Sequence, residues 1–258
     1  MHLPAGVRRV TDPLLGNVRV PILGGVNRGL WWSLISSGSG YASGRRAGAQ
    51  MQLIEDLIQQ GDVMCDVGAH HGYVTLAASR KVGARGAVHA FEPSVMNRER
   101  LSRHVGWNRL SNVSVHPYAL SDYDGECAFG GSGTSKMFAM GGGDELVQVR
   151  SAESLVQQHL CGAPDFVKID VEGAEADTLR GLLPVLSQSA RLFIAMHNAD
   201  ADAQCTAMLE RAGFNCIASH GLETSRKGPW RSDPDLYAVG PEYGGRARDL
   251  ATLRAANF

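Results

Sequence analysis

The sequence predicts an α/β fold built on one doubly wound, mostly parallel sheet, and three observations support the prediction. The chain has 258 residues, of which 44% are hydrophobic, which suits one sizeable domain. From residue 47 onward, short apolar segments typical of buried strands alternate with segments whose apolar residues recur at helical spacing. Strands that alternate with helices imply right-handed crossovers, which make the sheet largely parallel and cover both of its faces.

Residues 1–46 precede this regular pattern and are expected to form an N-terminal arm. They are rich in Gly, Pro and Arg and contain an apolar cluster over Leu30–Ile35. This cluster is too concentrated for a free tail, so we expect it to pack on the main domain or to help cover the functional site. A partly ordered arm is the alternative on composition alone, and a membrane-surface role for this basic, Trp-containing segment is a weaker one.

The main domain is expected over residues 47–243, and its first half contains three predicted strands. Its first helix ends before Gly61, and Ser94 is a good N-cap for another. The strands are predicted at Val63–Val67, Ala87–Phe91 and Val113–Pro117, and the helices at Ala47–Gln60, Tyr73–Lys81 and from Ser94 to about Trp107.

The second half begins with residues 122–150, a polar, Gly-rich segment with strand candidates at Glu126–Phe129 and Leu146–Val149. We expect this segment to form an edge hairpin or a flap. The strands beyond it are predicted at Phe166–Asp170, Arg191–Met196, Phe214–Ser219 and Leu236–Gly240, and the helices at Ser151–Leu160, Ala174–Leu186 and Asp202–Ala212. Residues 244–258 are expected to form a C-terminal tail with a short surface helix.

Composition restricts the partners and the compartment. The formal net charge of −1 gives no electrostatic footprint for nucleic acid, so a small-molecule partner is expected. The five cysteines have no CxxC pair, which favours a reducing compartment over a disulfide framework or a structural zinc site. No apolar run is long enough for an integral membrane segment or an uninterrupted signal core, so a cytoplasmic protein is expected. The sequence is compatible with a homodimer.

The end of the first strand carries the most informative motif, Asp66-Val67-Gly68-Ala69-His70-His71-Gly72-Tyr73. Glycines at positions 68 and 72 let the backbone turn sharply and approach a ligand, and the following helix offers free N–H groups. A dinucleotide fingerprint would need G-x-G-x-x-G, which this segment lacks. The spacing D-x-G-x-x-x-G is instead that of class I methyltransferases, which predicts Asp66, Gly68, Ala69 and Gly72 at a site for S-adenosylmethionine.

The next two strand ends extend this predicted cofactor site. Glu92, followed by Pro93, closes the second strand about 20 residues on, where a carboxylate suits the two hydroxyls of a ribose. After the third strand, the backbone of Ala119-Leu120 is expected in a turn that lines the adenine, although a plain turn explains the segment equally well. Tyr73 is expected to place its ring near the sulfonium. The same role is conceivable for Trp230, where ordinary loop packing is favoured.

The fourth and fifth strand ends supply the predicted chemistry. Asp170 ends one predicted strand, Glu172 lies two residues further on, and His197 follows the next strand. These three are the predicted catalytic residues, and for Glu172 an acid at a helix N-terminus is the alternative. Asp170 is expected to hold the acceptor or the cofactor amino group, and His197 to remove a proton as a hydroxyl is methylated. Glu175 is interpreted as an acid at a helix N-terminus. No metal is expected, because the adjacent His70 and His71 have no predictable third ligand.

These motifs together resemble the FkbM family of methyltransferases. The resemblance covers about residues 50–220, and its most distinctive part is Lys168-Ile169-Asp170-Val171-Glu172-Gly173-Ala174-Glu175. It implies a Rossmann-like class I methyltransferase sheet of seven strands with an antiparallel last strand, and S-adenosylmethionine as donor. It also implies O-methylation of a sugar, glycolipid or natural-product acceptor. Two departures matter: Ala195 stands where many members have an acid, and His70-His71 replace small residues of the glycine loop.

The resulting hypothesis is an S-adenosylmethionine-dependent O-methyltransferase. Two alternatives remain on the sequence: a non-catalytic S-adenosylmethionine-binding partner or sensor protein, and a small-molecule N-methyltransferase, which would need no strong base. The acceptor pocket is expected among residues 1–46, the 130–143 flap and the 221–235 loop.

Overall fold

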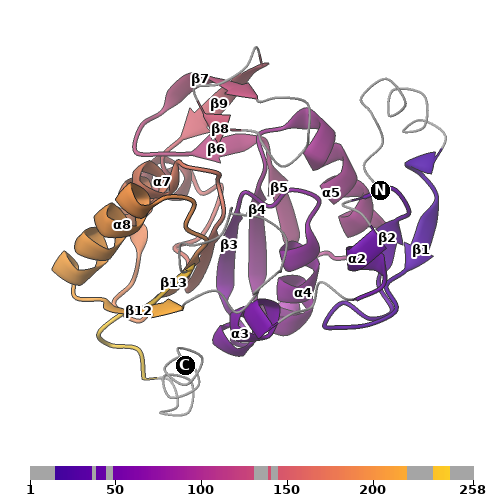
Figure 1. Ribbon diagram of the computed structural model, residues 1–258, viewed down its shortest axis with the longest axis horizontal. Coiled ribbons are helices and arrows are strands. Elements are labelled where there is room, and N and C mark those ends of the chain that lie inside the picture. Colours follow the sequence, from indigo (N-terminus) through magenta and orange to yellow (C-terminus); the bar gives the residue numbers. More distant parts are fainter. Residues whose placement is uncertain are drawn as a thin grey trace.

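The structure of the chain is a computed structural model that describes residues 15–36, 39–44, 49–130, 139–140, 145–219 and 235–244. Its described strands form a seven-stranded main sheet, a four-stranded smaller sheet and a two-stranded N-terminal hairpin (Figure 1). The predicted C-terminal helix, Trp230 with most of the 221–235 loop, and most of the 130–143 flap lie outside the described residues. Within the described ranges, no helix is long and apolar enough to cross a membrane.

The main sheet has the strand order β12-β13-β11-β10-β3-β4-β5. Its strands are β3 (Val63–Val67), β4 (Ala87–Phe91), β5 (Val113–His116), β10 (Phe166–Ile169), β11 (Arg191–Ile194), β12 (Asn215–Ser219) and β13 (Asp235–Val239). β13 runs antiparallel to both of its neighbours, whereas the pairs from β11 to β5 are parallel. This confirms the predicted mostly parallel sheet with an antiparallel last strand. From β3 the chain adds β4 and β5 on one side, and from β10 it adds β11 on the other side. The boundary between β3 and β10 is therefore a topological switch point, where open α/β sheets bind ligands.

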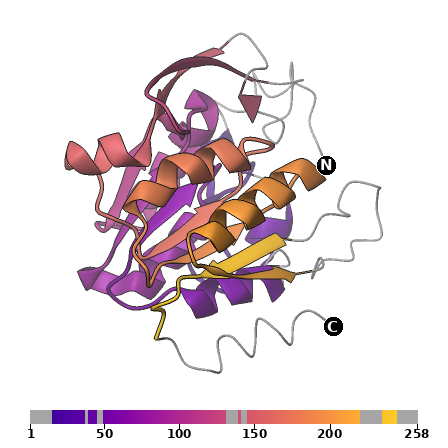
Figure 2. The ribbon, with the colours of Figure 1, turned by 90° about the vertical axis from the view of Figure 1, so that its left-hand side faces the viewer.

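Side chains alternate between the two faces of the sheet and create two cores. Met64, Phe166 and Phe193 pack with α3 and α4, whereas Cys65 and Val167 belong to the core on the opposite face. The first face is covered by α3 (Ala49–Leu57), α4 (Tyr73–Val82) and α5 (Val95–Trp107), and the second by α6 (Ala152–Gln157), α7 (Glu175–Leu182) and α8 (Ala199–Arg211). Figure 2 shows α7 and α8 side by side across the sheet. Short 3₁₀ turns follow α4 at Gly83–Arg85 and α7 at Leu183–Val185.

The strand candidates at Glu126–Phe129 and Leu146–Val149 pair antiparallel, as a hairpin requires, but residues 118–150 correct one sequence expectation. They build a separate sheet of order β6-β9-β7-β8 (Figure 1). Its strands are β6 (Tyr118–Leu120), β7 (Gly125–Gly130), β8 (Ala139–Met140) and β9 (Glu145–Arg150). Ala119 and Leu120, expected in a turn, are therefore strand residues whose partners are Val149 and Arg150. The physical reason is that both side chains are buried in cores, which a surface turn would expose.

The N-terminal hairpin of β1 (Arg19–Pro21) and β2 (Trp31–Ser33), with the short helix α2 (Ser39–Ala42), lies against α4 and α5 (Figure 1). Trp32 is fully buried and stacks on His104 of α5 with ring centroids 3.9 Å apart. The backbone N–H of Ser33 donates to His104 Nε2 (2.9 Å), and His104 Nδ1–H donates to the carbonyl of His71 (2.7 Å). His104 is thereby held as a neutral tautomer, and burial lowers its pKa to about 4.

Candidate active site

The glycine loop after β3 depends on two glycines with left-handed backbones. Gly68 has φ 74°, and a Cβ there would overlap the carbonyl oxygen of Asp170 after β10. Gly72 has φ 87° and caps α4, and a Cβ there would overlap the side chain of Leu101. The predicted need for glycine at both positions thus has a steric cause. The loop can pass directly over the end of β10 only because position 68 has no side chain.

A buried ion pair fixes the base of this loop. Asp66 on β3 and Lys168 on β10 are register partners, and Lys168 Nζ lies 3.0 Å from Asp66 Oδ1. The other Asp66 oxygen accepts a hydrogen bond from Thr75 Oγ1 at the start of α4 (2.6 Å). Lys168 Nζ also donates to the carbonyls of Gly68 (2.8 Å) and Val67 (3.3 Å). Burial by itself would lower the pKa of Lys168, but the carboxylates of Asp66 and Asp170 outweigh it and the pKa is raised.

Glu92 lies on the other side of the loop, directly after β4. Its carboxylate is buried, and it accepts hydrogen bonds from the backbone N–H of His70 at Oε2 (2.7 Å) and of Ser94 at Oε1 (2.9 Å). Burial raises its pKa to about 7 against the lowering effect of these bonds. His70 reaches Glu92 because it adopts a left-handed backbone with φ 51°. Each carboxylate oxygen has two lone pairs, so the geometry leaves Glu92 Oε2 able to accept a further donor.

Three other residues predicted at the cofactor site, Ala69, Pro93 and Tyr73, make contacts with other parts of the protein. Ala69 packs against Ala90 beneath α5, and its N–H donates to the carbonyl of Phe91 (3.0 Å). Pro93 follows Glu92 and its carbonyl accepts from Arg98 (2.8 Å). The ring of Tyr73 is largely buried in the cluster with Trp32 and Tyr41, which accounts for its position without a ligand.

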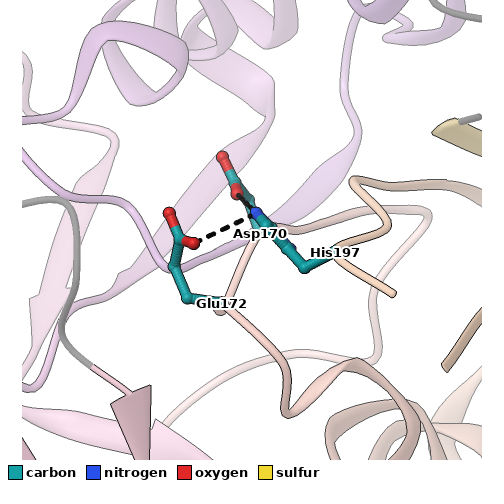
Figure 3. A group of neighbouring side chains, drawn as sticks. All are labelled: Asp170, Glu172 and His197. Carbon is teal, nitrogen blue, oxygen red and sulfur yellow. Dashed lines mark ion pairs between the residues drawn. The ribbon is translucent and has the colours of Figure 1, made fainter. Parts of the chain in front are cut away.

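Asp170, Glu172 and His197 converge at the ends of β10 and β11 (Figure 3). Asp170 Oδ1 lies 3.6 Å and Glu172 Oε2 3.4 Å from His197 Nε2. Glu172 reaches the group through a left-handed backbone with φ 51°, a conformation that costs a residue with a side chain about 1–2 kcal/mol. The carboxylates are 41% and 44% exposed, so solvent or a substrate can reach them. The structure therefore brings together the three residues predicted to be catalytic.

Glu175 contacts the predicted catalytic histidine, which the sequence does not indicate. It begins α7, as a helix N-terminal acid should, and accepts a hydrogen bond from the N–H of Gly173 (2.9 Å). It is also fully buried and pairs with His197, with its Oε1 2.6 Å from Nδ1. Burial by itself would lower the pKa of His197, but Glu175, Asp170 and Glu172 together raise it to about 9. The imidazole consequently holds its proton at neutral pH, whereas the predicted role as a base needs a neutral imidazole.

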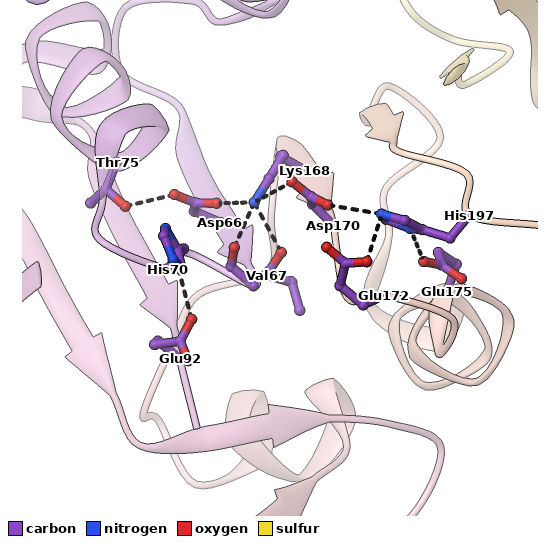
Figure 4. Close-up of polar contacts among 11 residues, drawn as sticks. Asp66, Val67, His70, Thr75, Glu92, Lys168, Asp170, Glu172, Glu175 and His197 are labelled. Atoms are coloured by element: carbon purple, nitrogen blue, oxygen red, sulfur yellow. Dashed lines mark hydrogen bonds and ion pairs between the residues drawn. The ribbon is translucent and has the colours of Figure 1, made fainter. Parts of the chain in front are cut away.

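The polar groups form one continuous chain across the carboxyl edge of the sheet. Figure 4 shows it running from Thr75 through Asp66, Lys168 and Asp170 to His197. Sequence reasoning missed Lys168, which sits 3.8 Å from Asp170 Oδ2 and links the glycine loop to the acidic cluster. A lysine inside the otherwise apolar strand Phe166–Ile169 was the available signal, because a buried ammonium needs a buried carboxylate.

Comparison with known proteins agrees with this architecture. The Methyltransferase FkbM domain family matches residues 66–216, more than half of the chain. The hexuronic acid methyltransferase AglP of Haloferax volcanii is 26% identical over 167 residues, covering 63% of this chain and 67% of AglP. The crystal structure of an O-methyltransferase from Bacillus cereus in complex with SAH superposes with a TM-score of 0.50 at 14% identity, covering 74% of this chain and 80% of that one.

The strand order, the glycine loop and the acidic strand ends define a class I S-adenosylmethionine-dependent methyltransferase. The chain belongs to the FkbM methyltransferase family.

Proposed function

We propose that this methyltransferase transfers a methyl group to a hydroxyl of a sugar, glycolipid or natural-product acceptor. The observation that carries the proposal is the convergence of Asp170, Glu172 and His197 beside the glycine loop, with both carboxylates exposed. A hydroxyl is a poor nucleophile until its proton is drawn away, and a cluster of carboxylates is suited to that task. An amine acceptor would need no such cluster.

The cofactor side of the proposal assigns Glu92 to the ribose and Gly68 to the methionine end of S-adenosylmethionine. Glu92 Oε2 accepts one hydrogen bond from His70, which leaves acceptor capacity for a ribose hydroxyl. Gly68 keeps the loop backbone close to Asp170, so donor and acceptor sites adjoin. When bound, S-adenosylmethionine supplies an electrophilic methyl on a positively charged sulfur.

Transfer forms a carbon–oxygen bond to the acceptor as the carbon–sulfur bond breaks, and the hydroxyl proton must leave. In this proposal, Asp170 and Glu172 accept a hydrogen bond from that hydroxyl and take up or relay its proton. Because the carboxylates hold the proton on His197 at neutral pH, its first role is to orient them. Aligning the reacting atoms lowers the activation barrier by about 7–11 kcal/mol in well-oriented systems.

The acceptor class rests on a distant likeness. AglP, named as a hexuronic acid methyltransferase, shares 26% identity with this chain over 167 residues. That similarity supports sugar hydroxyls, and uronic acids among them, as the first acceptors to try.

The test is a labelled-methyl transfer assay against uronic-acid glycans, neutral glycans, hydroxylated natural products and amines. We expect transfer to a hydroxyl acceptor, strongly reduced in Asp170→Ala and His197→Ala variants that still bind S-adenosylmethionine in calorimetry. Asp177→Ala is the matched control, since this exposed carboxylate pairs with Arg180 on the surface of α7. Full turnover in both site variants, or transfer only to amines, would overturn the proposal.

A further inference from the structure

The cluster at the ends of β10 and β11 has the composition and spacing of a cation site. Asp170, Glu172 and His197 each offer one ligand atom, and these atoms all lie within 4.8 Å of one another (Figure 3). The two separations from His197 Nε2 are 3.4 Å and 3.6 Å. Ligands about 2.0–2.2 Å from one tetrahedral ion lie about 3.3–3.6 Å apart, so both separations from His197 already fit such an ion, and the two carboxylates lie within 4.8 Å of each other.

A second, independent observation comes from Glu175, which is fully buried behind His197. Its Oε1 lies 2.6 Å from His197 Nδ1, and its Oε2 has no hydrogen-bond partner among the described residues. Glu175 keeps a proton on Nδ1, so a cation that displaces the proton of Nε2 meets a lone pair on the side of the ring where Asp170 and Glu172 lie (Figure 4). Histidines that bind metals are oriented in this way by a carboxylate behind the ring.

The charge around the imidazole also favours a cation. Three carboxylates surround His197, while the nearby Lys168 is engaged first by Asp66 at 3.0 Å and lies 3.8 Å from Asp170. Carboxylates with one imidazole form a mixed oxygen and nitrogen donor set, which suits Mn²⁺ and Zn²⁺ better than Mg²⁺ or Ca²⁺.

We propose that Asp170, Glu172 and His197 bind one divalent transition-metal ion, with Glu175 as the residue that positions His197. Three protein ligands leave open coordination positions for solvent or for an acceptor oxygen. A bound ion would polarise an acceptor hydroxyl and help it lose its proton. This last role rests on the proposed O-methyl transfer, whereas the binding site itself does not. The proposal departs from the sequence expectation of no metal, which considered only the neighbours His70 and His71.

Binding is tested on the full chain after chelator treatment, by calorimetry with MnCl₂ and with ZnCl₂ and by the loss of the free Mn²⁺ resonance signal. We expect one strong site per chain, with affinity reduced at least about 10-fold in Asp170→Asn and Glu172→Gln, and about 10–100-fold in Glu175→Gln. Asp177→Asn should bind Mn²⁺ as the parent does. Circular dichroism before and after heating establishes that each variant is folded. If the folded parent binds neither Mn²⁺ nor Zn²⁺, or the site variants bind as tightly as the parent, the site does not exist.

A second pair of measurements separates this inference from the proposed function. Transfer to a hydroxyl acceptor that falls with chelator and returns with Mn²⁺ supports a role for the ion in transfer. Transfer that is unchanged by chelator overturns that role and leaves O-methylation standing. Mn²⁺ binding that depends on Asp170, Glu172 and Glu175, with transfer to amines alone, would support the site while overturning the proposed function.

Discussion

Replacing Lys168 by Met tests how much the buried ion pair contributes to the stability of the fold. The variant leaves the fully buried Asp66 carboxylate with the hydroxyl of Thr75 as its hydrogen-bond donor. The carbonyl of Gly68 loses the hydrogen bond from the lysine, whereas that of Val67 keeps the N–H of Asp170. Removing one partner of a buried pair typically costs about 3–5 kcal/mol, a large share of the roughly 5–15 kcal/mol that stabilises a domain. We therefore expect the urea midpoint to fall steeply.

A double-mutant cycle identifies the cause. Asp66→Asn combined with Lys168→Met removes both charges, so its loss of unfolding free energy should be smaller than the sum of the single losses by at least about 1 kcal/mol. Lys81→Met, an exposed lysine at the end of α4, should change stability by less than about 0.5 kcal/mol. Strictly additive losses, or a Lys168→Met variant as stable as the parent, would refute the reasoning that the pair is energetically coupled.

Three further predictions concern the cofactor loop and the N-terminal hairpin. Glu92→Gln should weaken S-adenosylmethionine binding about 10–150-fold in calorimetry, which corresponds to the free energy of hydrogen bonds to a charged group. An unchanged affinity would show that Glu92 does not bind the cofactor. Gly68→Ala should also weaken binding, because its Cβ would overlap the Asp170 carbonyl, and a variant that binds normally would show that the loop need not lie so close. Burial lowers the pKa of His104 to about 4, so its contribution to stability is complete above its unfolded pKa near 6.5 and is lost as the pH falls towards 4. Between about pH 7.5 and pH 4.5, this group should lower the free energy of unfolding in urea by about 2.5 kcal/mol. The His104→Phe variant should lack this loss, and an equal pH dependence in the two proteins would contradict the prediction.

Much of the fold was accessible from local sequence pattern. The strands Val63–Val67 and Ala87–Phe91 coincide with their predicted bounds, because each is a short apolar run that ends at a loop residue. Ser94 caps α5 as expected, its Oγ accepting from the N–H of Asn97. Residues 118–150 were harder, since pairing between β6 and β9 joins segments that are distant in sequence, and neither segment signals its partner.

The sequence by itself determined the residue types of the site: glycine at positions 68 and 72, carboxylates at the ends of three strands and a histidine after a fourth. These follow from local sterics and from the parallel order of the strands. Only the tertiary structure decided which charges meet. Packing buries Glu175 behind His197 and places Lys168 between Asp66 and Asp170, and the surrounding carboxylates then raise the pKa of His197. Interaction energies between charges depend on distance and burial, and neither can be read from positions along a chain.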